Sequence, residues 1–289
     1  MEFLHSLPVT GVVPEALACR LDERLQLYLL IGGMPEAVET WSEAHDLNIA
    51  DPQLWQPINR QLADILQMYR GDFSRHPDRA VTPRITALWQ TIPSQLGKDN
   101  RKFRYAAVAP SARAREYKTA VQWLADAGLV HKVSRASAAR LPLSAYDDPA
   151  SFKLYMHDVG LLRRMAGIQP AQALADNRLY VELKGSITEN YVRQSLMPQL
   201  ETVPRYWAER PYEVDFLVQV ENEILPVEVK SSRAVRATSL QKYAERHNPA
   251  LRICFSRQNL QLRDGLLNIP LYLADETQRL ASEALALGR

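Results

Sequence analysis

The chain has 289 residues, of which 46% are hydrophobic and 24% are charged, and its formal net charge is +2. This length suits about two domains, and the composition excludes disordered, collagen-like and low-complexity proteins, because it offers enough apolar surface to bury a core. No apolar run approaches the roughly 18–20 residues that cross a bilayer, and the first residues do not resemble a signal peptide. The two cysteines, Cys19 and Cys254, indicate neither a disulfide framework nor a zinc site. We therefore expect a cytosolic protein.

The first part of the chain is expected to be helical. Residues 14–31 and 53–73 each carry apolar residues at a spacing of three or four, which predicts amphipathic helices. Gly32 and Gly33 end the first of these, and a short helix is expected to follow through Trp41. Residues 1–75 are therefore predicted to form a helical region.

Residues 76–145 predict three helices followed by a β-wing. The expected elements are a helix from Pro83, a short helix over 93–97, a helix over 112–127 capped by Ser111, a strand over 129–133 and a returning strand. This order of elements is typical of a winged helix-turn-helix domain.

The same region holds the main charge asymmetry of the chain. Ten basic and only three acidic residues lie between Lys98 and Arg140. In a winged helix the start of the third helix reaches bases and phosphates, and Arg113, Arg115 and Lys118 lie at that position. The pattern predicts DNA binding by these three residues. A solvated basic face and a protein-docking winged helix are the alternatives that the sequence leaves open.

Residues 146–289 change to strand character. The expected elements are a strand at 152–156, a helix at 187–197, strands at 205–208, 213–220 and 224–231, a helix near 238–247, and strands at 251–255 and 269–273. This order predicts an α/β domain with a mixed central sheet, so the whole chain is expected to be a multi-domain α/β protein.

A two-residue turn at Glu221 and Asn222 fixes the register of two of these strands. The register places six apolar side chains on one face of the hairpin, in the pairs Val214–Val229, Phe216–Val227 and Val218–Leu225. On the other face it pairs Glu213 with Lys230 and Asp215 with Glu228.

The pair of acids predicts a metal site. Opposed β-carbons lie roughly 4.5–5.5 Å apart, so the carboxylates of Asp215 and Glu228 repel, and a divalent cation would remove that repulsion. We expect these two residues to hold Mg²⁺ or Mn²⁺, with Lys230 on the same face stabilising developing charge or positioning water. Glu189, expected on the exposed surface of the preceding helix, is the fourth candidate. The alternative is an exposed hairpin of mixed charge in which Glu213 and Lys230 form an ordinary ion pair.

At these residues the chain resembles a known family. The stretches Glu189-Asn190, Tyr206-Trp207, Glu213–Phe216 and Pro226–Ser231 resemble the restriction-endonuclease-like PD-(D/E)xK pattern. Three further stretches, Tyr28–Glu36, Arg113–Tyr117 with Trp123-Leu124, and Lys153–Leu162, resemble the C-terminal domain of unknown function in a family of bacterial and archaeal AAA+ ATPases. The resemblance implies that Glu189, Asp215, Glu228 and Lys230 are the nuclease-like positions, and it implies a winged helix in the middle of the chain.

Members of that family carry an upstream ATPase domain with a phosphate-binding loop, and this chain contains no G-x-x-x-x-G-K-[S/T] motif. The resemblance therefore implies no ATP binding by this chain, with residues 1–75 similar to the lid-side helices of an AAA+ module. It predicts a truncated member or a separately encoded C-terminal half, and an ATPase as partner or missing upstream domain. We expect a DNA-binding protein with a nuclease-like domain. The alternative is a non-catalytic adaptor that uses its domains for protein contacts.

Overall fold

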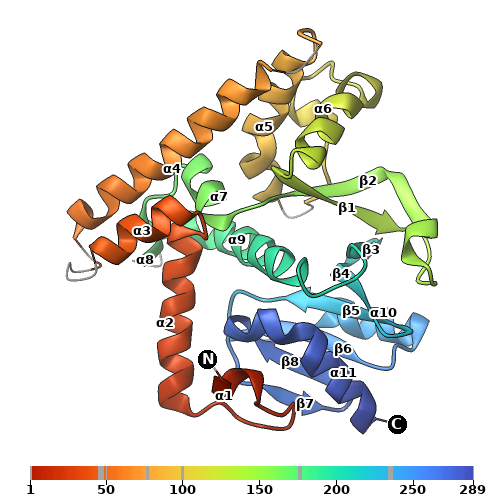
Figure 1. Cartoon of the computed structure of the whole chain (residues 1–289). Helices are drawn as coiled ribbons and strands as arrows, with labels where there is room; N and C mark the ends of the chain where they lie inside the picture. The colour runs from red at the N-terminus through yellow and green to blue at the C-terminus, as the bar shows by residue number, and fades with distance from the viewer. Residues whose placement is uncertain are drawn as a thin grey trace. The chain divides into compact units, whose positions relative to one another are not determined.

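A computed structural model describes residues 2–44, 49, 51–75, 78–98, 101–174, 178–233 and 237–288. The chain is a mixed α/β protein with a helical N-terminal region and an eight-stranded mixed sheet (Figure 1). In the described part of the chain, no helix has both the length and the apolar composition needed to cross a membrane.

The chain forms two compact units, and each is assembled from separate stretches of sequence. Unit 1 contains Met1–Gln26, Val133–Phe152 and Tyr191–Arg289, and unit 2 contains Leu27–Lys132 and Lys153–Asn190. The predicted division at residues 75 and 145 is a different partition, based on chain order, and it stays a prediction.

Helices make up most of unit 2. They are the last part of α2 (Glu15–Ile31), α3 (Pro35–Glu43), α4 (Pro52–Phe73), α5 (Thr82–Leu96), the 3-10 turn η1 (Tyr105–Ala107), α6 (Ala114–Asp126), α7 (Val159–Met165), α8 (Pro170–Leu174) and most of α9 (Arg178–Leu196). The helices predicted at 14–31 and 53–73 are confirmed as α2 and α4. The Asp51 carboxylate caps α4 by accepting the N–H of Gln53 at 2.8 Å.

The elements predicted for residues 76–145 differ from the structure in three respects. The returning strand does not lie in this range, because the strand that follows β1 (Val130–Ala136) is β2 (Asp147–Met156). The short helix expected over 93–97 is wrong, because α5 continues through Pro93 to Leu96. Pro93 is itself buried on the apolar face of α5, so the spacing of that face carries across the proline. The N-cap of α6 is Arg113 rather than Ser111, because the N–H of Ala112 closes a turn onto Ala109 and delays the helix start.

Within unit 2, residues 31–33 at the end of α2 pack closely against residues 158–161 at the start of α7. Gly32 has a φ of +82°, a conformation open to glycine, and the Asp158 carboxylate accepts the N–H of Gly33 at 2.7 Å. The same carboxylate caps α7 through the N–H of Leu161. A Cβ added to Gly160 would lie 2.1 Å from the carbonyl oxygen of Ile31. Glycine at position 160 is therefore what allows these backbones to approach.

The central sheet has the strand order β2-β1-β3-β4-β5-β6-β8-β7. Its strands are β1 (Val130–Ala136), β2 (Asp147–Met156), β3 (Arg205–Glu209), β4 (Tyr212–Val220), β5 (Glu223–Val229), β6 (Arg252–Ser256), β7 (Gln261–Arg263) and β8 (Leu266–Pro270). Strands β3, β4 and β5 are antiparallel neighbours, whereas β5, β6 and β8 run parallel. The last strand predicted at 269–273 is displaced, because β8 ends at Pro270 and the chain continues as the 3-10 helix η3 (Leu271–Glu276).

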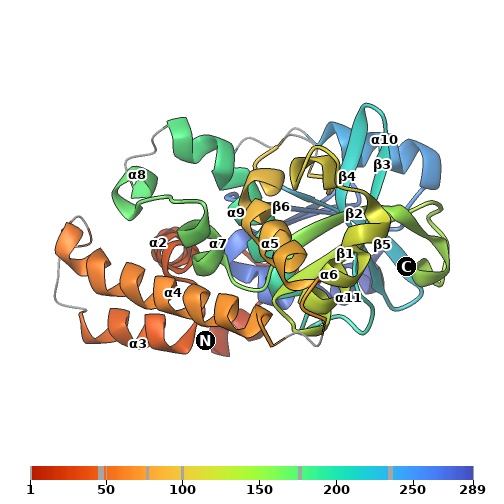
Figure 2. The ribbon, with the colours of Figure 1, turned by 90° about the horizontal axis from the view of Figure 1, so that it is seen from above.

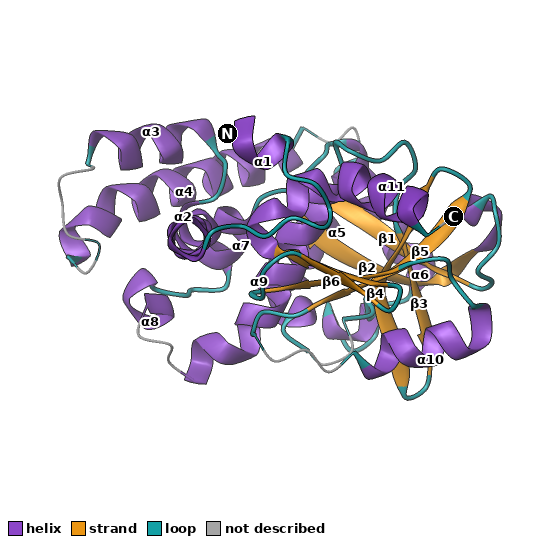
Figure 3. Cartoon of the chain, turned by 90° about the horizontal axis from the view of Figure 1, so that it is seen from below, coloured by secondary structure: helices purple, strands orange, loops and turns teal. Residues whose placement is uncertain are grey.

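Helices cover both faces of the sheet in unit 1. Helix α10 (Thr238–His247) packs on β4 and β5, and α11 (Thr277–Leu287) packs on β4 and β8 from the opposite side (Figures 2 and 3). The remaining described helices of this unit are α1 (Glu2–His5), the first part of α2, the end of α9 and the 3-10 helices η2 (Leu143–Tyr146) and η3. Leu240 and Tyr243 of α10 are buried against Leu217 and Cys254 of the sheet. Strand burial on both faces explains the apolar runs in β4 and β5.

Candidate functional site

The hairpin formed by β4 and β5 has the predicted register over most of its length. Phe216 pairs with Val227, Val218 with Leu225 and Val220 with Glu223, which confirms the two-residue turn. Glu221 in that turn has a φ of +55°, as a primed hairpin turn requires.

The register changes between β3 and β4, beside the open end of the hairpin. The step from Arg205 to Trp207 in β3 advances two positions, whereas the paired step from Leu217 to Val214 in β4 advances three, which is a β-bulge around Asp215 and Phe216. Val214 therefore packs in one cluster with Leu217, and the prediction that it shares a face with Phe216 is wrong. Val229, predicted to be buried, is half-buried.

The structure brings Asp215, Glu228 and Lys230 together beside this bulge. The Asp215 carboxylate accepts the backbone N–H of Val229 at 2.8 Å, and the Lys230 ammonium donates to Glu228 Oε1 at 2.5 Å. Glu228 is only 6% exposed, whereas the Lys230 side chain is 30% exposed. The mixed-charge alternative predicted an ion pair between Lys230 and Glu213. In the structure the Lys230 ammonium pairs with Glu228 instead. Asp215 and Lys230 are both half-buried, so the cluster is open to solvent at these two residues while Glu228 is enclosed.

The charges of this cluster perturb one another. Burial raises the pKa of Glu228, and the nearby Asp215 carboxylate raises it further, against the opposing effect of Lys230 and of the Leu240 N–H. Burial would lower the pKa of Lys230, but its hydrogen bond to Glu228 and the two carboxylate charges raise it overall. Lys230 is therefore an ammonium at neutral pH, suited to stabilising negative charge and not to acting as a base.

One carboxylate oxygen of Glu228, Oε2, is buried and makes no hydrogen bond within the part of the chain that the structure describes. The Leu240 N–H lies close enough to the carboxylate to lower its pKa, but no hydrogen bond from it reaches Oε2. A buried acceptor without a donor is costly, so this atom marks a place where a cation or a donor would be favourable.

Glu189 lies in unit 2, on the stretch of α9 before Asn190, and it is only 1% exposed. Its carboxylate contacts the guanidinium of Arg101, the hydroxyl of Tyr155 and the ammonium of Lys153, the last at 3.1 Å. Lys153 is fully buried. The expectation that Glu189 is an exposed helix-surface carboxylate is therefore wrong, because these partners hold it inside its own unit.

The partners of Glu189 were not predicted as a cluster. Lys153 and Tyr155 are two residues apart on β2, so they share a face of that strand. A lysine within the otherwise apolar run from Phe152 to Met156 is a signal that a buried acid must pair with it. The sequence does not say which acid.

The three predicted DNA-contacting residues lie at the start of α6. Arg113 is its N-cap, and the side chains of Arg113, Arg115 and Lys118 are all exposed. The Glu116 carboxylate accepts the Arg113 N–H at 3.2 Å and fixes the first turn. The basic groups are therefore displayed from one end of a capped helix.

Among the described residues, no group of three or more His, Cys, Asp or Glu side chains is arranged to hold a metal ion. A metal at the candidate site would therefore have only two protein carboxylates, those of Asp215 and Glu228. Mg²⁺ accepts such sites because it keeps several waters and substrate oxygens in its coordination sphere.

Comparisons with known proteins identify two families. No curated protein matches the chain. Among solved structures, protein VC1899 from Vibrio cholerae matches with 15% identity and a TM-score of 0.22, over 82% of this chain. The chain spans 57% of the length of that protein, and a likeness this weak supports no inference. Residues 184–273 match the domain of unknown function DUF4143. Residues 22–172, more than half of the chain, match the domain of unknown function DUF8612, and the chain belongs to that family.

Proposed function

We propose that this chain binds DNA and hydrolyses phosphodiester bonds with a divalent metal ion at Asp215, Glu228 and Lys230. The observation that carries the proposal is the grouping of two carboxylates and an ammonium at a β-bulge, where Glu228 has a buried oxygen without a donor. The Asp215 carboxylate is near enough to raise the pKa of Glu228, so the two acids repel each other, and bulges often aim side chains at a site.

The residues present fit a metal ion of the Mg²⁺ or Mn²⁺ type. Asp215 is fixed by the Val229 N–H, and the free oxygen of Glu228 is a hard donor that such a cation prefers. When bound, the cation would supply Lewis-acid polarisation of a phosphate oxygen and lower the pKa of a bound water. Asp215 and Glu228 would hold it.

Lys230 has a separate role in this proposal. Its ammonium is held on Glu228 and is partly open to solvent, so it can approach a phosphate. Charge that develops on the phosphate oxygens during hydrolysis would be stabilised there. We place Glu189 outside the reacting group, because its carboxylate is engaged by Arg101, Lys153 and Tyr155.

The DNA-binding part of the proposal rests on α6. We infer that α5, η1, α6, β1 and β2 form a winged-helix-like region, because a short helical turn separates two helices and two strands follow them. Exposed guanidiniums and an ammonium at the start of α6 suit contacts to phosphates. The restriction-endonuclease-like assignment and an AAA+ ATPase partner are proposals of the same kind, supported by the stretches that resemble those families.

A non-catalytic adaptor is the second candidate function. It is favoured by the closed ion pair between Lys230 and Glu228 and by the finding that, in the part of the chain that the structure describes, no three metal-ligating side chains are grouped there. In an adaptor the same cluster would be a structural remnant, and the exposed start of α6 would dock a protein.

Thermal unfolding in a Mn²⁺ titration distinguishes these functions. If the metal binds only the folded chain, the stabilisation should grow with the logarithm of its concentration and reach about 2.7 kcal/mol at a hundred times Kd. Asp215→Asn should remove this effect while keeping an acceptor for the Val229 N–H. Lys230→Ala should retain much of it.

The matched control is Glu223→Gln, at the far end of the same hairpin. It should respond to Mn²⁺ as the wild type does. An unfolding midpoint of the wild-type chain that ignores Mn²⁺ would favour the adaptor.

The salt dependence of duplex DNA binding tests α6. Each phosphate contact contributes about −0.9 to the slope of log K against log salt concentration, so Arg115→Ala should reduce that slope by roughly one. Arg263→Ala, which removes an exposed guanidinium on β7, is the control and should leave the slope unchanged. Undetectable binding at low salt would count against DNA as the partner.

A further inference from the structure

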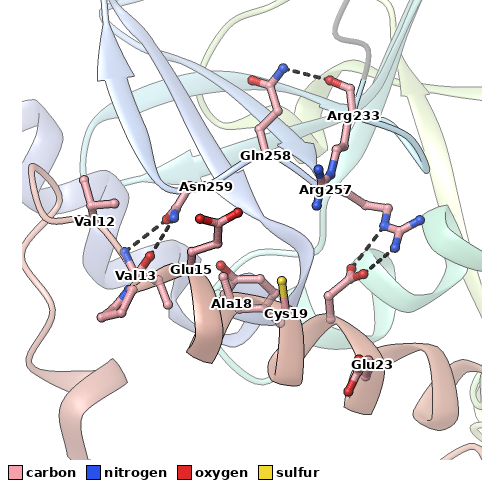
Figure 4. A pocket seen from close by; sticks show the side chains of 13 residues that line it. Val12, Val13, Glu15, Ala18, Cys19, Glu23, Arg233, Arg257, Gln258 and Asn259 are labelled. Carbon is pink, nitrogen blue, oxygen red and sulfur yellow. Dashed lines mark hydrogen bonds and ion pairs between the residues drawn. The ribbon is translucent and has the colours of Figure 1, made fainter.

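A cavity in unit 1 is lined by none of the candidate-site residues Asp215, Glu228 and Lys230. It has a volume of about 760 Å³ and lies between the first turns of α2 and the loops that follow the parallel strands (Figure 4). Arg233 follows β5, Arg257–Asn259 follow β6, and Tyr272 follows β8. The carboxyl ends of parallel strands are the usual binding edge of an open α/β sheet, and this volume is typical of small-molecule sites.

The walls of this cavity are fixed before any ligand arrives. Asn259 accepts the N–H of Val13 at 3.1 Å and donates to its carbonyl at 2.7 Å, so it holds the chain that leads into α2. The guanidinium of Arg257 pairs with both carboxylate oxygens of Asp22. The Gln258 amide donates to the Arg233 carbonyl at 2.7 Å. Such a framework would bind with little loss of conformational entropy.

The charges of the cavity are segregated between its walls. The acids Glu15, Asp22 and Glu23 all belong to α2, and the guanidiniums of Arg233 and Arg257 belong to the strand-end loops. Asp22 and Arg257 neutralise each other. Within the described residues, Glu15, Glu23 and Arg233 have no ion-pair partner. Figure 4 shows the Glu15 carboxylate rising from the helix and the Arg233 side chain extending toward the helix.

A buried hydroxyl completes the cavity. Tyr272 Oη has no hydrogen-bond partner among the described residues. Burial, together with the charges of Asp22 and Cys19, raises the pKa of this phenol to about 12, so it stays a donor. An anion alone would be repelled by the helix wall, and a cation alone by Arg233.

We propose that this cavity binds a small zwitterion, with a protonated amine at Glu15 and a carboxylate or phosphate at Arg233 and the Tyr272 hydroxyl. This site is independent of the proposed hydrolysis. A zwitterion is favoured because unpaired charges of opposite sign face one cavity, with the Glu15 and Glu23 carboxylates on α2 and the Arg233 guanidinium on the strand-end loops.

The chain contains its own reporter for this cavity. Cys19 is exposed on the α2 wall, whereas Cys254 is fully buried and burial raises its pKa to about 12. Alkylation of the native full-length chain by N-ethylmaleimide should therefore modify Cys19 alone. A ligand that fills the cavity should slow that reaction.

The experiment measures the labelling rate of Cys19 with five probes at equal concentration. The zwitterions are 6-aminohexanoate and phosphoethanolamine, which distinguish a carboxylate from a phosphate end, and the single-sign probes are spermidine, succinate and inorganic phosphate. At about ten times its Kd, a bound zwitterion should slow labelling by about tenfold. The single-sign probes should slow it by less than twofold.

Variants locate the effect. Arg233→Gln and Glu15→Gln should each reduce the protection given by the zwitterion at least fivefold, with each rate compared to that of the same variant without probe. Arg263→Gln, an exposed arginine outside the cavity, should keep full protection. The proposal is overturned if no zwitterion slows labelling at about 10 mM, if single-sign probes protect equally well, or if both cavity variants remain protected.

Discussion

Replacing Glu189 with Gln is expected to lower the free energy of unfolding by about 3–5 kcal/mol. Lys153 is fully buried and depends on the Glu189 carboxylate at 3.1 Å for its compensating charge. Removing one member of a buried ion pair leaves the other charge in a medium that solvates it poorly. The effect is measured by urea denaturation of the full chain, followed by circular dichroism.

A matched surface variant calibrates this expectation. Glu39→Gln removes an exposed carboxylate from α3 and should change stability by less than about 0.5 kcal/mol. The double variant Lys153→Met with Glu189→Leu removes the fully buried pair but leaves the Arg101 guanidinium without this carboxylate, so it should recover part of the loss. A loss below about 1 kcal/mol in Glu189→Gln would contradict the buried pairing.

Replacing Gly160 with Ala is expected to cost about 3 kcal/mol or more. The added Cβ would lie 2.1 Å from the Ile31 carbonyl oxygen and 2.8 Å from the Gly32 nitrogen, which are backbone atoms that cannot rotate away. Relief requires separation of the two stretches that the Asp158 carboxylate joins. Thermal unfolding of the variant measures the cost.

Gly71→Ala is the control for Gly160→Ala, because it adds the same methyl group at a position without a close contact. Gly71 is helical, in α4, and a Cβ there would meet nothing within 4 Å. The substitution should stabilise the chain by about 0.5–1 kcal/mol, since alanine has the higher helix propensity. Equal effects at Gly71 and Gly160 would show that the close approach does not govern stability.

Local patterns in the sequence predicted local structure well. The apolar spacing of α2 and α4 and the turn at Glu221 and Asn222 depend on neighbouring residues, and the structure confirms them. The proline in α5 misled the prediction, because burial of its ring on the helix face outweighs its local preference to end a helix.

Features that depend on distant residues were not predictable. The bulge that moves Val214 arises from pairing with β3, and the pairing of Glu189 with Lys153 joins residues 36 positions apart. Asp22 and Arg257, which pair across the cavity beside α2, are separated by 235 positions. The interleaving of the two units has the same origin, since a single sequence carries no signal for which strands and helices return to one core.

The candidate site could be predicted only in part, because some of its contacts are local and others depend on distant residues. Alternation and turn length predicted that Asp215, Glu228 and Lys230 lie near one another, and their contacts confirm this. The β4–β5 pairs run only from Val220–Glu223 to Phe216–Val227, so the direct opposition of Asp215 to Glu228 and of Glu213 to Lys230 stays a prediction. The sequence pattern did not predict that Asp215 would accept the Val229 N–H, since this contact depends on the bulge. Glu189 was assigned by resemblance, and its burial could not be inferred from a helix position.

Nicking of supercoiled plasmid in the presence of Mn²⁺, run beside single-stranded DNA, tests most directly whether Asp215, Glu228 and Lys230 form a hydrolytic site. The wild-type chain should cut at least one of these substrates, and chelation of the metal should stop the reaction. Lys230→Met should lose at least about a hundredfold in rate while the chain still binds Mn²⁺, because the ammonium stabilises developing charge. Asp215→Asn should lose both cleavage and Mn²⁺ binding, whereas Glu223→Gln should retain both. Cleavage that persists in Asp215→Asn, or a wild-type chain that cuts neither substrate, would contradict the proposed hydrolysis and favour the adaptor.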